Sequence, residues 1–403
     1  MNKCALALAM VSAVSAVSSC AGTAAAQYRL RADAFYTASD TTSGFVMLTS
    51  EARYPSWLYA EAVMWLGTGD YHGDVMVASV RAREPHGYGE VRAGRMLVAT
   101  GALRPVHLDG VDATARAPWG TSIEVFGGSP VAPQYEPRDY DWAVGGRMAQ
   151  KLSTYGTVGL SYLQMRKDGE VSYEELGVDA LATPFRWLDA AFAGTVDLQS
   201  LGLGDARLSL ASRFGGVRLE LFAVQRSPSH LLPANSLFSA LGDVPSQRAG
   251  AALLWRAAPR LDVLGEGAAE SLGGELGVHA LLRATLRLDD RGESALGIEG
   301  RREDIPFAGA VGSSASPTES WTGVRGTARV PMNRFLSAAA EVEVVVPDDA
   351  RGRGRVWPWG LLALRFKPEP RWEMAGAVEA SSSPTALSSV SGLVRVSYVW
   401  GKP

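Results

Sequence analysis

The chain has 403 residues, of which 47% are hydrophobic, 20% are charged and 8% are aromatic, with a formal net charge of -3. This apolar content and small net charge exclude an intrinsically disordered chain. The near-neutral balance provides no basic surface for nucleic acid. Ordinary globular domains would divide this length into two or three units, but one closed β-sheet can contain all of it.

The first 26 residues have the features of a secretory signal peptide. Lys3 supplies the positive start, Ala5 to Val17 the apolar stretch, and Ala24-Ala25-Ala26 a small-residue cleavage site. We therefore expect residues 1–26 to be removed and residues 27–403 to form a single domain outside the cytoplasm.

Both cysteines of the chain, Cys4 and Cys20, fall within this leader. The mature chain is then predicted to contain no disulfide, no thiolate metal site and no cysteine nucleophile. Val17-Ser18-Ser19-Cys20 also resembles a weak bacterial lipobox, which would make Cys20 a lipidated N-terminus. Either form of processing exports the protein.

Beyond the leader, apolar residues recur at every second position. No apolar run approaches the ~18 to 20 residues that a membrane-spanning helix needs. In residues 276–288 the even positions are all aliphatic, whereas Arg283 and Arg287 occupy odd positions. A strand places all the aliphatic side chains on one face, but a helix would scatter them around its circumference.

Such runs, bounded by turn-forming residues, predict about 22 strands. In chain order they are expected at residues 28–37, 44–53, 57–67, 73–83, 87–98, 109–117, 121–127, 142–152, 156–167, 170–182, 186–198, 204–214, 216–226, 247–257, 260–270, 273–288, 292–303, 318–331, 334–346, 355–367, 370–382 and 389–400.

The connections alternate in length along the chain. Every second one is short and built of turn formers, as in Tyr54-Pro55-Ser56 and Thr183-Pro184-Phe185. The longest intervening connections cover residues 128–141, 227–246 and 304–317. Short turns at one end of the strands and longer loops at the other are typical of an outer-membrane β-barrel.

The two faces of the predicted strands differ in composition. The apolar face is rich in Leu, Val and Ala, and aromatic residues lie near strand ends, where a membrane interface favours them. The alternative is that these aromatic residues fill the dry core of a soluble sandwich. The residues concerned are Trp57, Trp142, Trp187, Trp255, Trp372, Tyr398 and Trp400.

Two segments carry a more specific likeness. Val91-Arg92-Ala93-Gly94-Arg95, followed by Leu108-Asp109-Gly110-Val111, resembles a strand and loop of several porin-like families. The last strand resembles the terminal signal read by the outer-membrane assembly machinery, although Gly401-Lys402-Pro403 follow the aromatic residue that usually ends the chain. The side chains that form this signal are Val394, Val396, Tyr398 and Trp400.

From about Tyr28 to Trp400 the chain thus resembles a bacterial outer-membrane porin or porin-like barrel, without a single close family. The resemblance implies an all-β fold, a single transmembrane antiparallel up-and-down barrel of about 22 strands (18 to 22). Both termini would be periplasmic, and the partners would be outer-membrane lipid, the assembly machinery and small hydrophilic solutes or ions. Because alternation begins at Tyr28, we expect no plug domain. The sequence leaves the oligomeric state open.

Arg95 is a local exception to the pattern. Strict alternation sends Arg92 inward and Arg95 toward lipid, where a mid-membrane charge costs ~2 to 4 kcal/mol. We therefore expect either a bulge near Gly94 or a position of Arg95 close to the interface.

The polar face carries charges that cannot remain dry and unpaired. They either hydrate and brace the wall, or form rows of opposite sign that orient solutes and tune ion selectivity. The pore-lining candidates are Arg92, Arg218, Arg248, Arg283, Arg287, Arg301, Arg325, Arg329, Arg365, Glu266, Glu341, Glu343 and Glu373. Further residues predicted to point inward are Arg207, Arg213, Arg226, Arg256, Arg395, Asp189, Asp197, Asp262, Glu270 and Glu379.

No motif of catalysis or metal binding stands out. The histidines lack metal-pair spacing, and no G-x-S-x-G elbow, P-loop or H-E-x-x-H occurs. We expect no enzyme activity, cofactor or metal. A membrane-embedded hydrolase pairing Ser161 or Ser209 with His279 is an alternative that rests on residue type alone.

One connection is a candidate for shaping a pore. The Pro-rich and acidic segment from Gly127 to Asp141 either folds inward to constrict a channel or stands outside as a receptor surface. The sequence as a whole predicts a channel for passive diffusion of small hydrophilic solutes. The alternative function is a structural or adhesion barrel with an occluded lumen and partner-binding outer loops.

Overall fold

The computed structural model describes residues 27–38, 42–54, 57–68, 73–131, 140–227, 246–272, 275–305, 319–348, 356–382 and 389–401. The predicted signal peptide and lipobox lie outside these residues. Within the described ranges, no helix has the length and hydropathy needed to cross a bilayer.

The described residues form 22 strands, which alternate in direction along the chain. Their bounds are β1 Gln27–Ala38, β2 Thr42–Tyr54, β3 Leu58–Gly67, β4 Asp74–Arg83, β5 Gly89–Val98, β6 Val106–Arg116, β7 Thr121–Pro130, β8 Trp142–Leu152, β9 Gly156–Lys167, β10 Glu170–Phe185, β11 Leu188–Asp197, β12 Gly202–Phe214, β13 Val217–Arg226, β14 Ser246–Ala258, β15 Leu261–Leu272, β16 Glu275–Arg287, β17 Ala295–Ile305, β18 Glu319–Pro331, β19 Leu336–Pro347, β20 Trp357–Glu369, β21 Trp372–Ser381 and β22 Ser389–Gly401.

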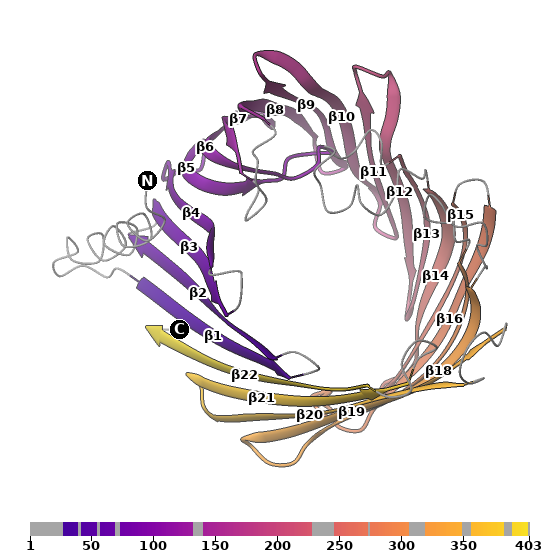
Figure 1. Cartoon of the computed structure of the whole chain (residues 1–403). Helices are drawn as coiled ribbons and strands as arrows, with labels where there is room; N and C mark the ends of the chain where they lie inside the picture. Colours follow the sequence, from indigo (N-terminus) through magenta and orange to yellow (C-terminus); the bar gives the residue numbers. More distant parts are fainter. Residues whose placement is uncertain are drawn as a thin grey trace.

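Each strand pairs antiparallel with the next, and β1 pairs with β22 to close the ring (Figure 1). The closing ladder runs from the pair Arg29 and Gly401 to the pair Ala38 and Gly392. The predicted closed up-and-down barrel of 22 strands is confirmed. Closure gives every strand a hydrogen-bonded neighbour on each side, although some ladders, such as the one between β4 and β5, stop short of the strand ends.

The strand bounds follow the predicted alternation closely. β8 and β9 begin and end at the predicted residues. Differences of three residues occur at the start of β6 (Val106) and of β17 (Ala295) and at the end of β7 (Pro130) and of β10 (Phe185). Those of β6 and β7 fall in the sector where the wall departs from a regular barrel.

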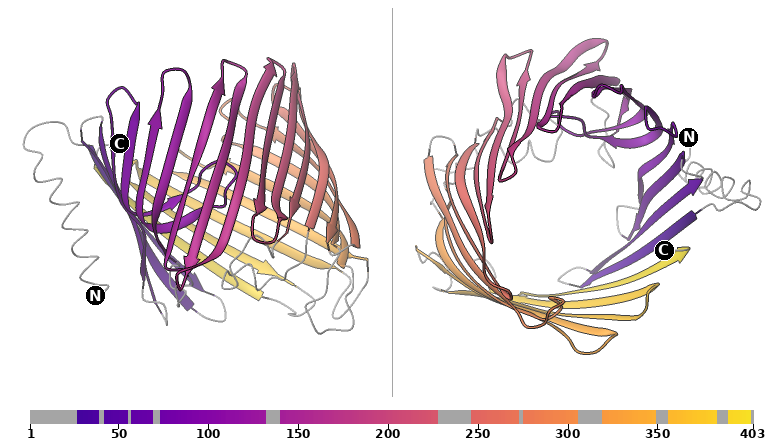
Figure 2. Two further views of the ribbon diagram at one scale, coloured as in Figure 1. Left: turned by 90° about the horizontal axis from the view of Figure 1, so that it is seen from above. Right: turned by 180° about the vertical axis from the view of Figure 1, so that it is seen from behind.

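The connections divide the barrel into two ends, which Figure 2 shows from the side. The end of the barrel that carries the connection from β2 to β3, and every second connection after it, is called the turn end. The opposite end is called the loop end. Gln27 and Gly401 both lie at the turn end. The predicted sorting by length holds with exceptions. The connections at residues 168–169 and 198–201 are short and lie at the loop end, whereas the longer connection at residues 288–294 lies at the turn end.

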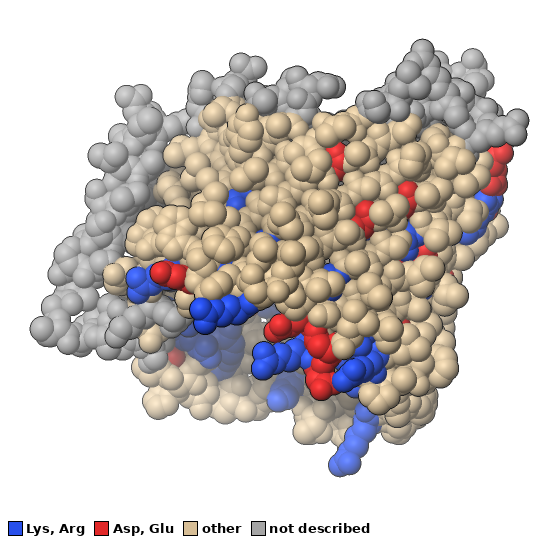
Figure 3. Space-filling model, turned by 90° about the horizontal axis from the view of Figure 1, so that it is seen from below, with Lys and Arg blue, Asp and Glu red and all other residues tan. Residues whose placement is uncertain are grey.

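The outward face is apolar and exposed. Leu282, Ile298 and Val342 have exposed fractions of 62%, 61% and 59%, and Figure 3 shows a mostly uncharged outer wall with charged side chains gathered near one rim. Of the aromatic residues predicted near strand ends, Trp142 lies at the loop end and the others lie at the turn end. Such a band is typical of a membrane interface.

Candidate functional site: the inward-folded strands and the charged lumen

β5 separates from β4 before it ends. Their ladder runs only from the pair Ala78 and Arg95 to the pair Arg83 and Glu90, so residues 96–98 have no partner in β4. The backbone turns at Gly94, which has a φ of +121°. A Cβ atom there would lie 2.2 Å from the carbonyl oxygen of Ala78. Only glycine permits this turn.

Two more glycines lie in register with Gly94 on the next two strands, β6 and β7. Gly94 pairs with Gly110, and Gly110 pairs with Gly128. A Cβ atom on Gly110 would lie 2.1 Å from the carbonyl oxygen of Gly127, and one on Gly128 would lie 2.3 Å from that of Asp109. We call Gly94, Gly110 and Gly128 the glycine crease. It allows β5, β6 and β7 to bend toward the lumen (Figure 1).

Beyond the crease, the inward face is apolar and dry. Met96, Leu108 and Leu163 each have an exposed fraction of 0%. Met96 of β5 and Leu108 of β6 belong to one buried cluster with Ala143 of β8 and Leu163 of β9. The bent strands therefore pack against the inner wall as side chains pack in a protein interior. The predicted wet inward face is therefore wrong in this sector. The lumen core consists of Met96, Val98, Leu103, Val106, Leu108, Phe126, Ala143, Leu163 and Met165.

Polar contacts hold the connection between β5 and β6 against the inner wall. We call residues 99–105 the tip. Within it, Arg104 Nε lies 3.5 Å from Glu175 Oε2, and the Arg104 guanidinium lies 4.2 Å from the centroid of the Tyr173 ring. Thr100 donates a 2.7 Å hydrogen bond to Glu124. The Glu175 side chain is only 1% exposed, so Arg104 neutralises a buried charge.

The tip is an inward-folded connection that the sequence analysis missed. The connection proposed to fold inward began at Gly127, but residues 127–130 belong to β7, and residues 132–139 lie outside the described residues. Tyr140, which follows them, packs against the lumen core. A signal for the tip was available, because Met96 and Leu108 place apolar side chains on a face that elsewhere carries charges.

Strict alternation assigns Arg95 to the outward side of β5, but β5 separates from β4 at this residue, and Arg95 reaches Asp74 on the inward face of β4. The register of β5 to both neighbours is continuous, so no extra residue is inserted at Gly94. Arg95 bonds to both carboxylate oxygens of Asp109, at 2.8 and 2.9 Å, and lies 3.5 Å from Asp74. It also donates to the carbonyl oxygen of Val75 at 3.0 Å. These contacts neutralise its charge near the loop end and bridge the gap between β4 and β5.

The register places all thirteen pore-lining candidates on the inward face. Eight of the nine arginines among them pair with a carboxylate on the same or a nearby strand. The ninth, Arg329, donates to the carbonyl oxygens of Gly292 and Glu293. The ion pairs are Arg92 with Glu61, Arg218 with Glu220, Arg248 with Glu266, Arg283 with Glu299, Arg287 with Asp262, Arg301 with Glu299 and Glu343, Arg325 with Glu341, and Arg365 with Glu373.

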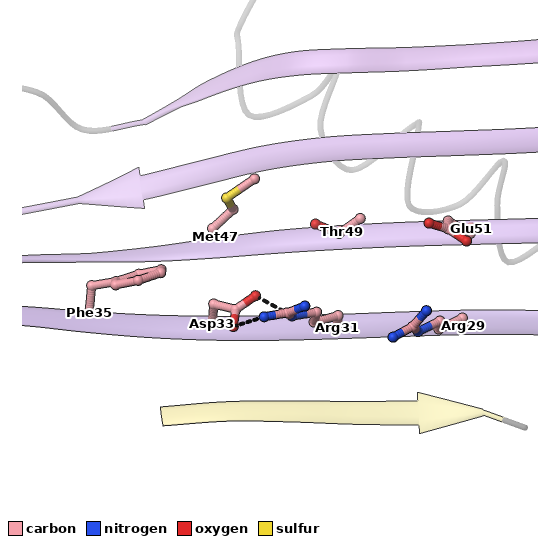
Figure 4. A pocket seen from close by; sticks show the side chains of 7 residues that line it. All are labelled: Arg29, Arg31, Asp33, Phe35, Met47, Thr49 and Glu51. Atoms are coloured by element: carbon pink, nitrogen blue, oxygen red, sulfur yellow. Dashed lines mark hydrogen bonds and ion pairs between the residues drawn. The ribbon is translucent and has the colours of Figure 1, made fainter. Parts of the chain in front are cut away.

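Local pairing of this kind braces the wall, and it cancels much of the charge over short distances. In the middle of the wall the charges alternate in sign from strand to strand, as in Arg283, Glu299, Arg325 and Glu343 on β16 to β19, and do not form the separate rows of opposite sign that are one of the two predicted arrangements. A shallow depression of about 350 Å³ lies on β1 and β2 next to the closing ladder (Figure 4). In it Arg31 bonds Asp33 at 2.7 Å, whereas Arg29 and Glu51 point into the lumen without a carboxylate or guanidinium partner among the described residues.

Neither Ser161 nor Ser209 forms a hydrolytic pair with His279. His279 Nδ1 lies 2.6 Å from Glu303, and its Nε2 lies 3.7 Å from Glu266. Ser161 donates to the carbonyl oxygen of Gly177, and Ser209 donates to Glu220. The described part of the chain also holds no cluster of three or more His, Cys, Asp or Glu side chains suited to a metal ion.

No protein-family model and no curated protein matches the sequence. Among solved structures, the translocation pore of the P pilus usher PapC is similar over 94% of this chain and 100% of that chain, with 8% identity and a TM-score of 0.52. PapC in an Escherichia coli P pilus tip assembly intermediate is similar over 93% of this chain and 60% of that chain, with 10% identity and a TM-score of 0.56.

A third similar structure is OccK3 (OpdO) of Pseudomonas aeruginosa, over 93% of this chain and 96% of that chain, with 13% identity and a TM-score of 0.47. Likeness at these identities concerns the fold alone. At that level, the closed barrel of 22 antiparallel strands shares its fold with the PapC translocation pore.

Proposed function

We propose that this protein is an outer-membrane channel through which small hydrophilic solutes diffuse passively along a charge-lined lumen. Passive diffusion needs no catalytic group, only a continuous aqueous path with a constriction. Barrels of 16 to 18 strands already leave such a path, although larger ones can be plugged.

The main support is the exposure of the inward-facing charges. The side chains of Arg213, Arg256 and Arg365 are 60%, 65% and 52% exposed. Charged groups with this exposure face space that water can fill, since a dry filling would bury them at a large cost. The contrast with Glu175, which is 1% exposed beneath the tip, separates an open sector from a closed one.

The inward fold gives the channel its asymmetry. The tip and lumen core cover the inner faces of β7 to β10. Most ion-paired arginines of the wall from β12 through β22 keep contact with solvent, although Glu299 between Arg283 and Arg301 is only 4% exposed. The pore-lining candidates all belong to this open part, except Arg92. In this proposal the tip constricts the lumen, and the ion pairs keep the opposite wall rigid and hydrated.

The outward face supports a location in the outer membrane and assembly through β22. Val394, Val396, Tyr398 and Trp400 share the outward face of β22, and the Tyr398 ring lies 4.1 Å from that of Trp400 and 4.4 Å from that of Trp372. We propose that this row is the feature that the assembly machinery reads and that the aromatic residues then anchor in the periplasmic interface.

Planar-bilayer recording tests the proposed function. The purified detergent-solubilised protein, shown to be folded by heat-modifiable migration on a gel, is expected to insert and give stepwise, lasting currents. A folded barrel that inserts but stays silent would contradict the channel and favour the occluded structural or adhesion barrel. A mature protein that dissolves without detergent would contradict the membrane location itself.

A further inference from the structure

The turn-end mouth of the lumen is lined by basic side chains. We consider the inward-facing charged residues that are no more than two residues from the end of a strand at the turn end. The arginines and lysines among them form what we call the basic ring. Carboxylates are few at this level: Glu90, Asp189, Asp262 and Glu373. The basic ring consists of Arg29, Arg53, Arg81, Arg83, Arg116, Lys151, Arg213, Arg218, Arg256, Arg287, Arg329 and Lys367.

The loop end differs in sign. At the same depth from that end, the described inward-facing cations are Lys167, Arg226 and Arg248. The carboxylates at this level are Asp74, Glu170, Asp197, Glu270, Glu303 and Glu379. The excess of positive charge therefore belongs to the turn end and is not a property of the whole lumen.

Part of the ring is free of carboxylates. Among the described residues, no carboxylate lies within ion-pair distance of Arg29, Arg53 or Arg83. The guanidinium groups of Arg53 and Arg81 flank the Tyr59 ring, at 5.5 and 4.7 Å from its centroid. Stacking on Tyr59 fixes these two planar groups while their edges remain available to donate hydrogen bonds.

A guanidinium held in this way is suited to carboxylate and phosphate groups, which it can bind with two parallel hydrogen bonds. The barrel wall has a low dielectric constant, so it focuses the field of the ring into the aqueous mouth. Arg29, Arg53, Arg81 and Arg83 lie on β1, β2 and β4, which are close neighbours in the sheet. An anion in the mouth thus meets three cations without a carboxylate partner among the described residues, Arg29, Arg53 and Arg83, beside Arg81, which lies 3.7 Å from Glu90.

We propose that the basic ring is a binding station for small anionic solutes that carry carboxylate or phosphate groups, and that it makes the channel anion-selective. This inference rests on the proposed channel function and specifies its substrate class. Because the Debye length falls from ≈10 Å at 0.1 M salt to 3 Å at 1 M, the preference for anions should be clear at low salt and should shrink at high salt.

The reversal potential in a KCl gradient across a planar bilayer measures this preference. The wild-type channel is expected to pass chloride severalfold better than potassium at low salt. The variant Arg29→Gln/Arg53→Gln/Arg83→Gln is expected to lose most of this preference while it still conducts. Inorganic phosphate should reduce the chloride current through the wild type more than through the variant.

A matched variant, Lys167→Gln/Arg226→Gln/Arg248→Gln, removes the same charge at the loop end and is expected to retain most of the anion preference. Equal shifts in both variants, or a wild type without anion preference, would overturn the basic ring as the selective element while leaving the channel intact. Absence of any current from the folded wild-type barrel would overturn the channel, and this inference with it.

Discussion

The variant Arg104→Ala is expected to conduct more than the wild type and to show a noisier open level. Removal of Arg104 leaves Glu175, which is 1% exposed, as a buried charge without its cation, at a cost of roughly 3 to 5 kcal/mol. The tip is joined to the rest of the chain only by the ends of β5 and β6, so it can relieve this cost by leaving the wall. Single-channel conductance measures the result.

The double variant Arg104→Ala/Glu175→Ala is the matched control, because it removes both charges and leaves no unpaired carboxylate beneath the tip. Its conductance should lie between those of the wild type and of the single variant. If Arg104→Ala folds, as judged by its heat-modifiable migration, and conducts like the wild type, then the tip does not constrict the lumen.

The variant Gly110→Ala is expected to destabilise the barrel by about 1 to 3 kcal/mol or more, the usual cost of an added group in a packed site. Its Cβ atom would lie 2.1 Å from the backbone oxygen of Gly127 and 2.8 Å from the Cα atom of Gly128. Backbone atoms of a paired strand cannot move aside as a flexible side chain can. The midpoint of urea unfolding in detergent or lipid vesicles measures the loss.

Gly326→Ala in β18 provides the control for this second prediction. No atom lies within 4 Å of a Cβ atom placed on Gly326, so the same substitution should change stability by less than about 0.5 kcal/mol. If Gly110→Ala were as stable as Gly326→Ala, the close approach across the glycine crease would be an incorrect description of these strands.

The architecture was predictable because a barrel wall repeats one simple constraint. Each strand separates lipid from the lumen, so side chains must alternate along its whole length, and runs such as residues 276–288 display this period directly. Arg283 and Arg287 could be assigned to the inward face from this period alone. The bounds of β8 and β9 followed from the turn residues that flank them.

The inward fold was not predictable in the same way, because it depends on contacts across strands. Gly94, Gly110 and Gly128 lie far apart in the sequence and become a crease only when the register aligns them. Likewise, apolar Met96 and Leu108 hint at a dry inner face on either side of the tip, but the contact of Arg104 with Glu175 forms only after β5 and β6 have bent. The pairing of each inward arginine also depends on register, which alternation leaves open.

The most direct test of the account is a thiol-accessibility scan along β16 in a chain with Cys4 and Cys20 replaced by serine. Leu281→Cys and Thr285→Cys place thiols on the inward face, and Leu282→Cys and Leu286→Cys place them on the outward face. We predict that a charged, membrane-impermeant thiol reagent modifies only the inward positions of the lipid-embedded barrel, whereas nitroxide-labelled lipids contact only the outward ones. The reverse pattern, or equal reactivity on both faces, would contradict a wall that separates lipid from an aqueous lumen.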